Sequence, residues 1–396
     1  MQKLNKSGLI FILGLLAMIG PLNIDTCLPA FGQIADDLNV EFKEVEFSMS
    51  LFFMGFGLGQ LIAGYLSDIK GRKLVLTIGL LITISGSIML VFVENIELFY
   101  WGRMLQALGG GFVGVTIATI VRDSFKGREA AEIMSNIIMI AMAAPLIAPS
   151  LGAGLLNAFG WHSIFIFIAG YGVLQLIFVR WKIVDVVRSS VDRDSFFVRL
   201  KQVYTNRSAL RYVVAMAIPS GALYTYLTTA PFIYQEYFGL SESLFAILFG
   251  LNGGIIIISS KVNATLVKTI GPEKLLGAGL LMHATTLTLI LVFLFLNYTN
   301  PYIVLSLLTF HIGSIGFISG NATAMALENY DRNIAGLANS QMRVLGILFG
   351  ALAGFLASSF YDHTLFPPIV VMLACSIIGG AAYFIINKRF TYVSQS

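Results

Sequence analysis

The stretch Leu287–Leu296 reads LTLILVFLFL, so apolar side chains occupy nearly every position in it. A strand of a membrane β-barrel would instead alternate apolar and polar residues. Inside a bilayer the backbone hydrogen bonds have to be satisfied within a helix or a closed barrel. This stretch therefore predicts a helix that crosses a membrane.

Runs of the same kind cover most of the chain. Of the 396 residues, 57% are hydrophobic and 12% are charged, whereas soluble domains carry about 25% charged residues. A soluble fold has too little interior to bury this much apolar surface. A membrane-spanning helix needs about 20 mostly apolar residues. Twelve such runs predict an all-α membrane protein, with limits at 8–31, 44–66, 74–93, 97–121, 130–157, 162–182, 209–234, 241–267, 274–296, 301–326, 334–360 and 365–387.

The basic residues predict the orientation of these runs. If the N-terminus is cytoplasmic, most of the 25 Lys and Arg residues fall on the cytoplasmic side, as is usual for membrane proteins. Lys43 falls on the outer face, and Arg103 and Arg343 fall inside runs. We therefore expect a multi-pass protein with both termini in the cytoplasm.

The chain also contains an internal similarity. Gly71 and Gly79 recur 200 positions later as Gly271 and Gly279, each pair following an even-numbered run and its short basic loop. Two similar six-helix halves predict a transporter whose site lies between them. The expected domains are an N-terminal bundle at 1–182, a cytoplasmic linker at 183–208 and a C-terminal bundle at 209–396.

Three local motifs resemble those of the major facilitator superfamily. The loop after the second run follows the superfamily pattern G-x-x-x-D-(R/K)-x-G-R-(R/K), except that Ile69 stands where a basic residue is usual. The fourth run carries the R-x-x-Q-x-x-G pattern of the family, and the fifth resembles the proline- and glycine-rich signature of drug/proton antiporters. The matching residues are Gly64, Asp68, Gly71, Arg72 and Lys73; Arg103, Gln106 and Gly109; and Pro145, Pro149, Gly152 and Gly154.

Further matches point to the bicyclomycin-resistance (Bcr/CflA) group. They are Asp25 to Ala30 in the first run, Arg122-Asp123 after the fourth, Gly160-Trp161 after the fifth and Asn321 in the tenth. The resemblance implies two pseudo-symmetric six-helix bundles in a bacterial inner membrane. It also implies export of small amphipathic molecules, driven by the proton gradient and without a cofactor.

Intramembrane ionisable residues are the candidates for proton coupling. Asp25 lies about 9 Å inside the outer end of the first run, and Arg103 lies at a similar depth in the fourth. A carboxyl group there should be protonated, paired or in contact with water. We expect Asp25 and Arg103 to form a pair or a water-bridged relay that Gln106 extends.

Arg343 is the first candidate for substrate binding, because it lies near the middle of the eleventh run. A guanidinium group matches a carboxylate with two parallel hydrogen bonds, so an anionic substrate is one expected partner. His311 is expected nearby, and Tyr224 and Tyr226 could form an aromatic wall. A scaffolding role for these aromatic residues is equally compatible with the sequence.

The loop motif is expected to act in conformational change. Charge contacts of Asp68, Arg72 and Lys73 could lock the two halves when the inner side is closed, and Arg122 and Asp123 could join them. In the fifth run, Gly152 and Gly154 would allow close helix approach, and Pro145 and Pro149 would allow bending.

Several alternatives stay open at this point. The cargo could be a carboxylate-rich metabolite or a siderophore, and a proton symporter would import rather than export. An enzyme is disfavoured, because the 4 histidines are scattered and no metal-binding, P-loop or nucleophile motif occurs. The basic residues are explained by topology, so no nucleic-acid partner is expected. The expected partners are a small molecule, protons and the lipid bilayer, and a monomer is expected because one chain holds both halves.

Overall fold

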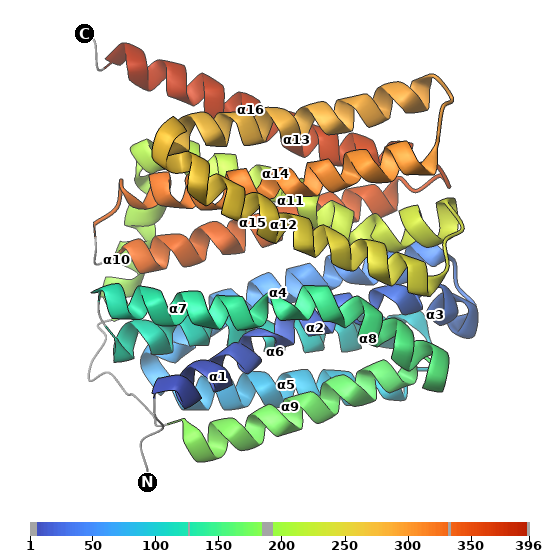
Figure 1. Ribbon diagram of the computed structural model, residues 1–396. Helices are drawn as coiled ribbons and strands as arrows, with labels where there is room; N and C mark the ends of the chain where they lie inside the picture. Colours follow the sequence, from blue (N-terminus) through green and yellow to red (C-terminus); the bar gives the residue numbers. More distant parts are fainter. Residues whose placement is uncertain (1–5, 126, 184–192, 332–333, 394–396) are drawn as a thin grey trace. The chain divides into compact units, whose positions relative to one another are not determined.

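The computed structural model describes residues 6–125, 127–183, 193–331 and 334–393 (Figure 1). Within these residues every regular element is a helix, as predicted. They form 12 helical segments that are long and apolar enough to cross a membrane, matching the predicted runs. The chain divides into two units, residues 1–192 with 240–250 and residues 193–239 with 251–396.

The first unit contains the elements of the first six spans. They are α1 (Lys6–Ala17), α2 (Ile19–Asp25), η1 (Leu28–Ala30), α3 (Phe31–Leu38), α4 (Phe42–Lys70), α5 (Arg72–Val91), α6 (Ile96–Ser124), α7 (Gly127–Ala141), α8 (Ala143–Phe159) and α9 (His162–Lys182). The second unit contains α10 (Arg193–Thr205), α11 (Arg207–Pro231), η2 (Phe232–Tyr237), most of α12 (Glu242–Ile270), α13 (Pro272–Phe295), α14 (Pro301–Leu327), α15 (Ala335–Ser359) and α16 (Phe366–Val393).

Proline residues interrupt the first and fifth spans. Pro21 and Pro29 cannot donate a backbone hydrogen bond to the residue four positions earlier, and the first span breaks after Ala17 and again after Asp25. In the same way, the fifth span breaks between α7 and α8, just before Pro145. The second break of the first span lies directly after Asp25.

Asparagine side chains fix the starts of three helices. Asn95, Asn206 and Asn300 each accept a hydrogen bond from a backbone N–H in the first turn of α6, α11 and α14, at 2.9, 3.1 and 2.9 Å. Asparagine is a preferred residue at this position, because its side-chain oxygen satisfies a donor that the helix leaves free.

Glycine allows α6 to pack closely against both α4 and α5. A Cβ atom on Gly86 of α5 would lie 2.6 Å from the backbone nitrogen of Gln106 on α6. Gly79 of α5 and Gly109 of α6 form a second close backbone contact, one to two turns further along these two helices. These contacts fix the position of α6 and hence of Arg103 and Gln106.

The internal similarity extends to backbone conformation. Gly71 precedes α5 with φ 90° and ψ 157°, and Gly271 precedes α13 with φ 88° and ψ 152°. Residues with a side chain rarely adopt such positive φ values. Gly79 packs against α6, and its counterpart Gly279 packs against α14. The same turn and the same helix pairing therefore occur in each half.

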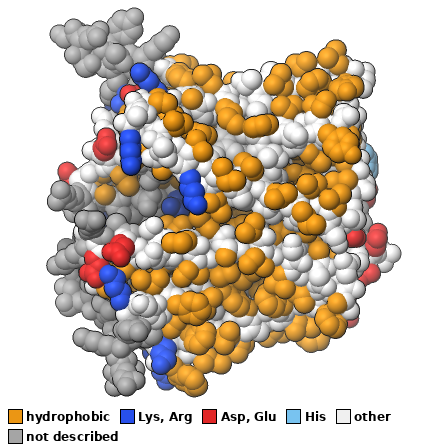
Figure 2. Space-filling view, viewed as in Figure 1, with side chains coloured by type: hydrophobic (Ala, Val, Ile, Leu, Met, Phe, Trp, Pro, Cys, Tyr) orange, Lys and Arg blue, Asp and Glu red, His pale blue; other side chains and the backbone are white. Residues whose placement is uncertain are grey.

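The surface matches a lipid environment. On the face shown in Figure 2, hydrophobic side chains cover the middle of the helices, and Lys, Arg, Asp and Glu gather toward the helix ends. Large apolar side chains such as Phe92, Trp101 and Phe310 are more than half exposed. Exposed apolar surface on this scale requires a covering partner, and the predicted bilayer provides one.

Candidate functional site

Asp25 is the last residue of α2 and lies at the break that Pro29 causes. Its side chain is buried, with 5% of its surface exposed. The next residue, Thr26, turns its hydroxyl group back to the carbonyl oxygen of Leu22, at 2.5 Å. An ionisable carboxyl group is thus held inside the bundle at the end of a short helix.

Gly152 of α8 lies directly against this break. A Cβ atom on Gly152 would overlap the carbonyl oxygen of Thr26, whereas a Cβ atom on Gly154 would meet nothing within 4 Å. Pro149 is buried on the same helix. One glycine of the predicted signature therefore contacts the chain segment that carries Asp25, and the other does not.

Arg103 is fully buried on α6 and has several partners. Its Nη1 donates to the backbone oxygen of Asn23 at 2.8 Å and to Oε1 of Gln106 at 2.6 Å. Its Nη2 lies 3.3 Å from Sδ of Met49, and the guanidinium group covers the ring of Phe52 at 4.5 Å. The oxygen atoms, the sulfur atom and the aromatic ring together stabilise the buried positive charge of Arg103.

Gln106 continues this network to α5. Its Nε2 donates to Oγ of Ser87 at 3.0 Å, and Ser87 donates to the backbone oxygen of Thr83 at 2.8 Å. The expected direct pair of Asp25 with Arg103 is not formed, and among the described residues no hydrogen bond or ion pair joins them. Arg103 bonds to the backbone of Asn23 instead, so a similar depth in the membrane did not predict a direct contact, and the water-bridged relay stays a prediction.

Asn23 is a polar residue that the sequence reasoning missed. It is fully buried on α2, and neither its Oδ1 nor its Nδ2 has a hydrogen-bond partner among the described residues. A Cβ atom on Gly110 of α6 would lie 3.6 Å from Nδ2. An unpaired amide in such a position costs free energy unless another molecule bonds to it. Its place two residues before Asp25, in an apolar run, was the signal that could have identified it.

Arg343 lies on α15 with its side chain exposed. Tyr224 lies on α11, which packs along α15, and its ring contacts Gly350 on the helix that carries Arg343. Within the described residues no carboxylate forms an ion pair with Arg343. The structure thus places Arg343 and Tyr224, two of the four predicted substrate-binding residues, on neighbouring helices.

The other two predicted residues are elsewhere. His311 has no described contact with Arg343, and instead its ring stacks on that of His283. Tyr226 is buried in a network in which Nδ2 of Asn252 donates to its hydroxyl group at 2.7 Å. Asn252 also bonds to Tyr234 of η2 and accepts from Thr309 of α14. This network joins four elements of the second unit.

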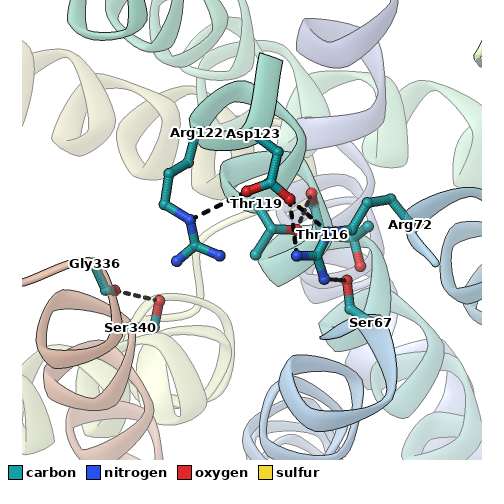
Figure 3. A network of polar contacts seen from close by, with 8 residues as sticks. All are labelled: Ser67, Arg72, Thr116, Thr119, Arg122, Asp123, Gly336 and Ser340. Atoms are coloured by element: carbon teal, nitrogen blue, oxygen red, sulfur yellow. Dashed lines mark hydrogen bonds and ion pairs between the residues drawn. The ribbon is translucent and has the colours of Figure 1, made fainter. Parts of the chain in front are cut away.

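The loop motif forms a cluster at one end of the first unit (Figure 3). Nε and Nη2 of Arg72 donate to Oδ2 of Asp123 at 3.0 and 2.8 Å, and both side chains are 2% exposed. Nη1 of Arg72 donates to Oγ of Ser67 at 2.6 Å, and Arg122 lies 3.6 Å from the other oxygen of Asp123. The contacts of Arg72 join α5 to α6 and to α4, and the contact between Arg122 and Asp123 lies within α6, so all of them belong to the first unit.

The remaining residues of the motif have different environments. Lys73 donates to the backbone oxygen of Arg180 on α9 at 2.9 Å. Gly71 supplies the turn, and a Cβ atom on Gly64 would meet nothing within 4 Å. The side chain of Asp68 lies outside the described part of the structure.

The spans and their buried polar residues indicate a multi-pass membrane protein. The chain belongs to the Major Facilitator Superfamily, because residues 13–354 match the sequence model of that family. It is 30% identical over 392 residues to the "Uncharacterized MFS-type transporter YdgK" of Bacillus subtilis (strain 168), covering 97% of this chain and 96% of that one.

Two other relatives carry names that refer to drug resistance. The "Bicyclomycin resistance protein homolog" of Haemophilus influenzae is 30% identical over 396 residues, covering 97% and 98% of the two chains. The "Multidrug resistance protein MdtL" of Escherichia fergusonii is 26% identical over 366 residues, covering 92% and 91%. These matches agree with the predicted bicyclomycin-resistance group.

Solved structures show the same fold. An inward-facing, unoccupied bacterial homolog of the human lysosomal transporter Spinster matches with a TM-score of 0.77 and 13% identity, covering 98% of each chain. A peptide transporter in complex with sulfate also gives 0.77, with 15% identity, covering 98% of this chain and 95% of that one. At these identities the likeness concerns the fold alone.

Proposed function

We propose that this protein exports small amphipathic molecules across the bacterial inner membrane in exchange for protons, with both termini in the cytoplasm. The names of its relatives from Haemophilus and Escherichia support a drug-like cargo. The observation that carries the proposal is Asp25, a buried carboxyl group at a helix break inside the first unit. One chain holds both halves, so a monomer is sufficient.

Proton exchange follows from the cost of burying charge. A protonated Asp25 is neutral and can stay buried, whereas an ionised Asp25 needs water or a cation. A cationic substrate and a proton would therefore compete for this carboxyl group. The two occupied states favour different access, so a proton entering from outside would accompany the release of cargo.

The Arg103 network serves as the fixed support of this site. Arg103 holds the carbonyl oxygen of Asn23, two residues before Asp25, and Gln106 and Ser87 orient Arg103. The unpaired amide of Asn23 supplies a donor and an acceptor for a polar group of the cargo. Gly152 allows α8 to follow any movement of the break.

The cluster of Arg72 and Asp123 acts at the cytoplasmic end. A buried ion pair with an additional serine partner holds α4, α5 and α6 together, so the first unit would move as a rigid body during alternating access. We propose that two charges beside it, the half-buried Lys73 and the exposed Arg122, make and break contacts as the transporter changes state.

A second candidate function is supported by Arg343. Its side chain is exposed, it forms no described ion pair, and Tyr224 lies on the neighbouring helix α11. An anionic, carboxylate-bearing metabolite would match a guanidinium group and a phenol. The direction of transport and the use of protons are the same in both candidates.

Everted membrane vesicles, acidified by respiration and monitored with a pH-gradient dye, test both candidates. Lipophilic cations should collapse the gradient in wild-type vesicles and in the matched control Asp36→Asn, whose exposed side chain lies on α3. Asp25→Asn should abolish the response. A response that persists in Asp25→Asn would refute the role of Asp25. If only polycarboxylates act, and Arg343→Ala removes the effect, the cargo is anionic.

A further inference from the structure

A cavity lies within the second unit, between the helices α10, α11 and α15. Its volume is about 190 Å³. The residues that line it come from these three helices and from Tyr330, which lies in the loop between α14 and α15. None of the lining residues takes part in the sites described above, so the cavity is a separate feature of this unit.

The lining of the cavity consists of aliphatic and aromatic side chains together with Gln341. The hydroxyl group of Tyr204 donates to Oε1 of Gln341 at 2.8 Å, and that of Tyr330 donates to the backbone oxygen of Val203 at 2.9 Å. Both hydroxyl hydrogens are thus used within the wall. The described lining residues carry no charge, so the cavity offers a ligand mainly apolar contact.

The walls of the cavity are held in place by contacts of α10. In addition to the two hydrogen bonds above, Nδ2 of Asn206, directly after this helix, donates to the backbone oxygen of Asn329 at 2.6 Å. Val203 and Tyr330 are buried in one apolar cluster, and α11 and α15 pack along each other. A site whose walls are already ordered loses little conformational entropy when a ligand enters.

The size and the lining of the cavity fit a single aromatic ring. An engineered apolar cavity of about 150 Å³ in another protein stays dry and binds benzene, whereas pockets for whole drug-sized molecules measure about 300–1,000 Å³. Tyr204, Tyr330 and Phe349 add aromatic side chains from three different segments to the lining. Aromatic rings attract each other in stacked and edge-to-face arrangements, so these side chains favour a ring over an alkyl chain.

The cavity opens to the surface at three of its residues. Tyr204 of α10, Leu210 of α11 and Phe349 of α15 are 46%, 42% and 41% exposed, although each of them also lines the cavity. A ring can therefore enter between these side chains, while the remainder of a larger molecule stays outside.

From this cavity we propose that the second unit binds one aromatic ring of an amphipathic cargo between α10, α11 and α15. The proposal rests on the proposed function for the identity of this ligand as cargo. The ring is buried among apolar side chains, and the polar or charged part of the cargo stays at the opening. Because the lining has no charge to match a head group, the site selects for the ring and tolerates different polar groups.

Photo-labelling of the full-length protein in lipid nanodiscs tests the site without transport. The probe is benzyltrimethylammonium with an azide on its ring, and mass spectrometry locates the labelled residues. Labels should fall on the cavity lining of α11 and α15. Unlabelled benzyltrimethylammonium should suppress them, whereas tetramethylammonium, which has a similar head group and no ring, should not. Labels that lie only outside the lining, or equal suppression by the two cations, would overturn the proposal.

Two variants of α15 form a matched pair for this experiment. Leu345→Trp places a larger side chain in the lining, and Leu352→Trp makes the same exchange at a 55% exposed position outside it. The affinity for the probe should fall about 10- to 150-fold in Leu345→Trp, the range expected when one ring loses its burial, and stay unchanged in Leu352→Trp. Equal affinities would contradict the assigned site. The competition in the wild-type protein remains decisive if Leu345→Trp does not fold.

A phospholipid with a photoreactive group on its acyl chain tests the other source of an apolar ligand. Lipid labels on the lining that the aromatic cation does not displace would show that a lipid chain fills the cavity, and would overturn the proposal. The ring site needs no proton gradient, so labelling should persist in Asp25→Asn. A failed vesicle response with intact labelling would therefore count against the proposed function, and lost wild-type labelling with an intact vesicle response against the ring site.

Discussion

Exchanging Gly152 for alanine tests the contact between α8 and the break at Asp25. The added Cβ atom would overlap the carbonyl oxygen of Thr26 and lie 2.8 Å from its carbonyl carbon, whereas ordinary contacts begin at 3.4 Å. Because two backbones meet there, no flexible side chain can yield. Overpacking of this kind costs about 1–3 kcal/mol.

Gly154→Ala is the matched control, since it lies on the same helix and its Cβ atom would meet nothing within 4 Å. Both variants gain about 1 kcal/mol of helix propensity, so their difference isolates the steric cost. That difference of about 1–3 kcal/mol corresponds to a change of about 5- to 150-fold in the unfolding equilibrium. For a unit of this size, the melting temperature of Gly152→Ala should be about 2–12 °C below that of Gly154→Ala.

Two measurements follow from this difference. Thermal unfolding in detergent, followed by tryptophan fluorescence, gives the melting temperatures. The vesicle assay gives the response to cations, which should fall in Gly152→Ala and persist in Gly154→Ala. If the two variants melt together and transport equally, α8 does not contact the break as closely as described, and the reasoning is refuted.

Three further predictions concern the buried polar contacts. Arg72→Gln removes the two hydrogen bonds that Asp123 accepts from Arg72 and leaves Arg122, at 3.6 Å, as the described cation beside this carboxylate, so it should destabilise the protein by up to about 3–5 kcal/mol. Lys73→Gln loses an exposed hydrogen bond to the backbone of α9 and should cost less than about 1 kcal/mol; equal melting temperatures would contradict this. Arg103→Lys keeps the charge but loses the forked geometry, so it should weaken the vesicle response, and full activity would show that the fork is dispensable. Tyr226→Phe should lower the free energy of unfolding by about 1 kcal/mol in urea or thermal unfolding, because Asn252 loses a hydrogen-bond partner. An unchanged stability would show that this hydrogen bond does not stabilise the fold.

The spans were predictable because lipid imposes a composition that is independent of tertiary packing. Apolar runs of sufficient length identify the helices, and Pro21, Pro29 and Pro145 indicate where they break. The repeat of Gly71 as Gly271 was also visible, since a turn with positive φ restricts the residue type.

The partners of the polar residues were harder to predict. Depth along a helix places Arg103 near the level of Asp25, but it does not give the direction of the side chain around the helix axis. His311 was expected beside Arg343, and it contacts His283 because α14 packs on α13. Asn23 was not predicted because charge was the main criterion for a candidate inside a span. A buried amide without a hydrogen-bond partner also indicates a binding site.

The shared turns at Gly71 and Gly271 have one more consequence. After the first turn the chain continues with Arg72, which forms the buried ion pair, and after the second it continues with Pro272, which has no charge and no backbone donor. The turn between the second and third spans of the first half is therefore followed by a residue of a buried ion pair, and the corresponding turn of the second half is followed by a proline with a fixed φ angle. The stability of an ion pair depends on temperature through the hydration of its charges, whereas a proline turn has no such dependence, so the corresponding turns of the two halves respond differently to heating.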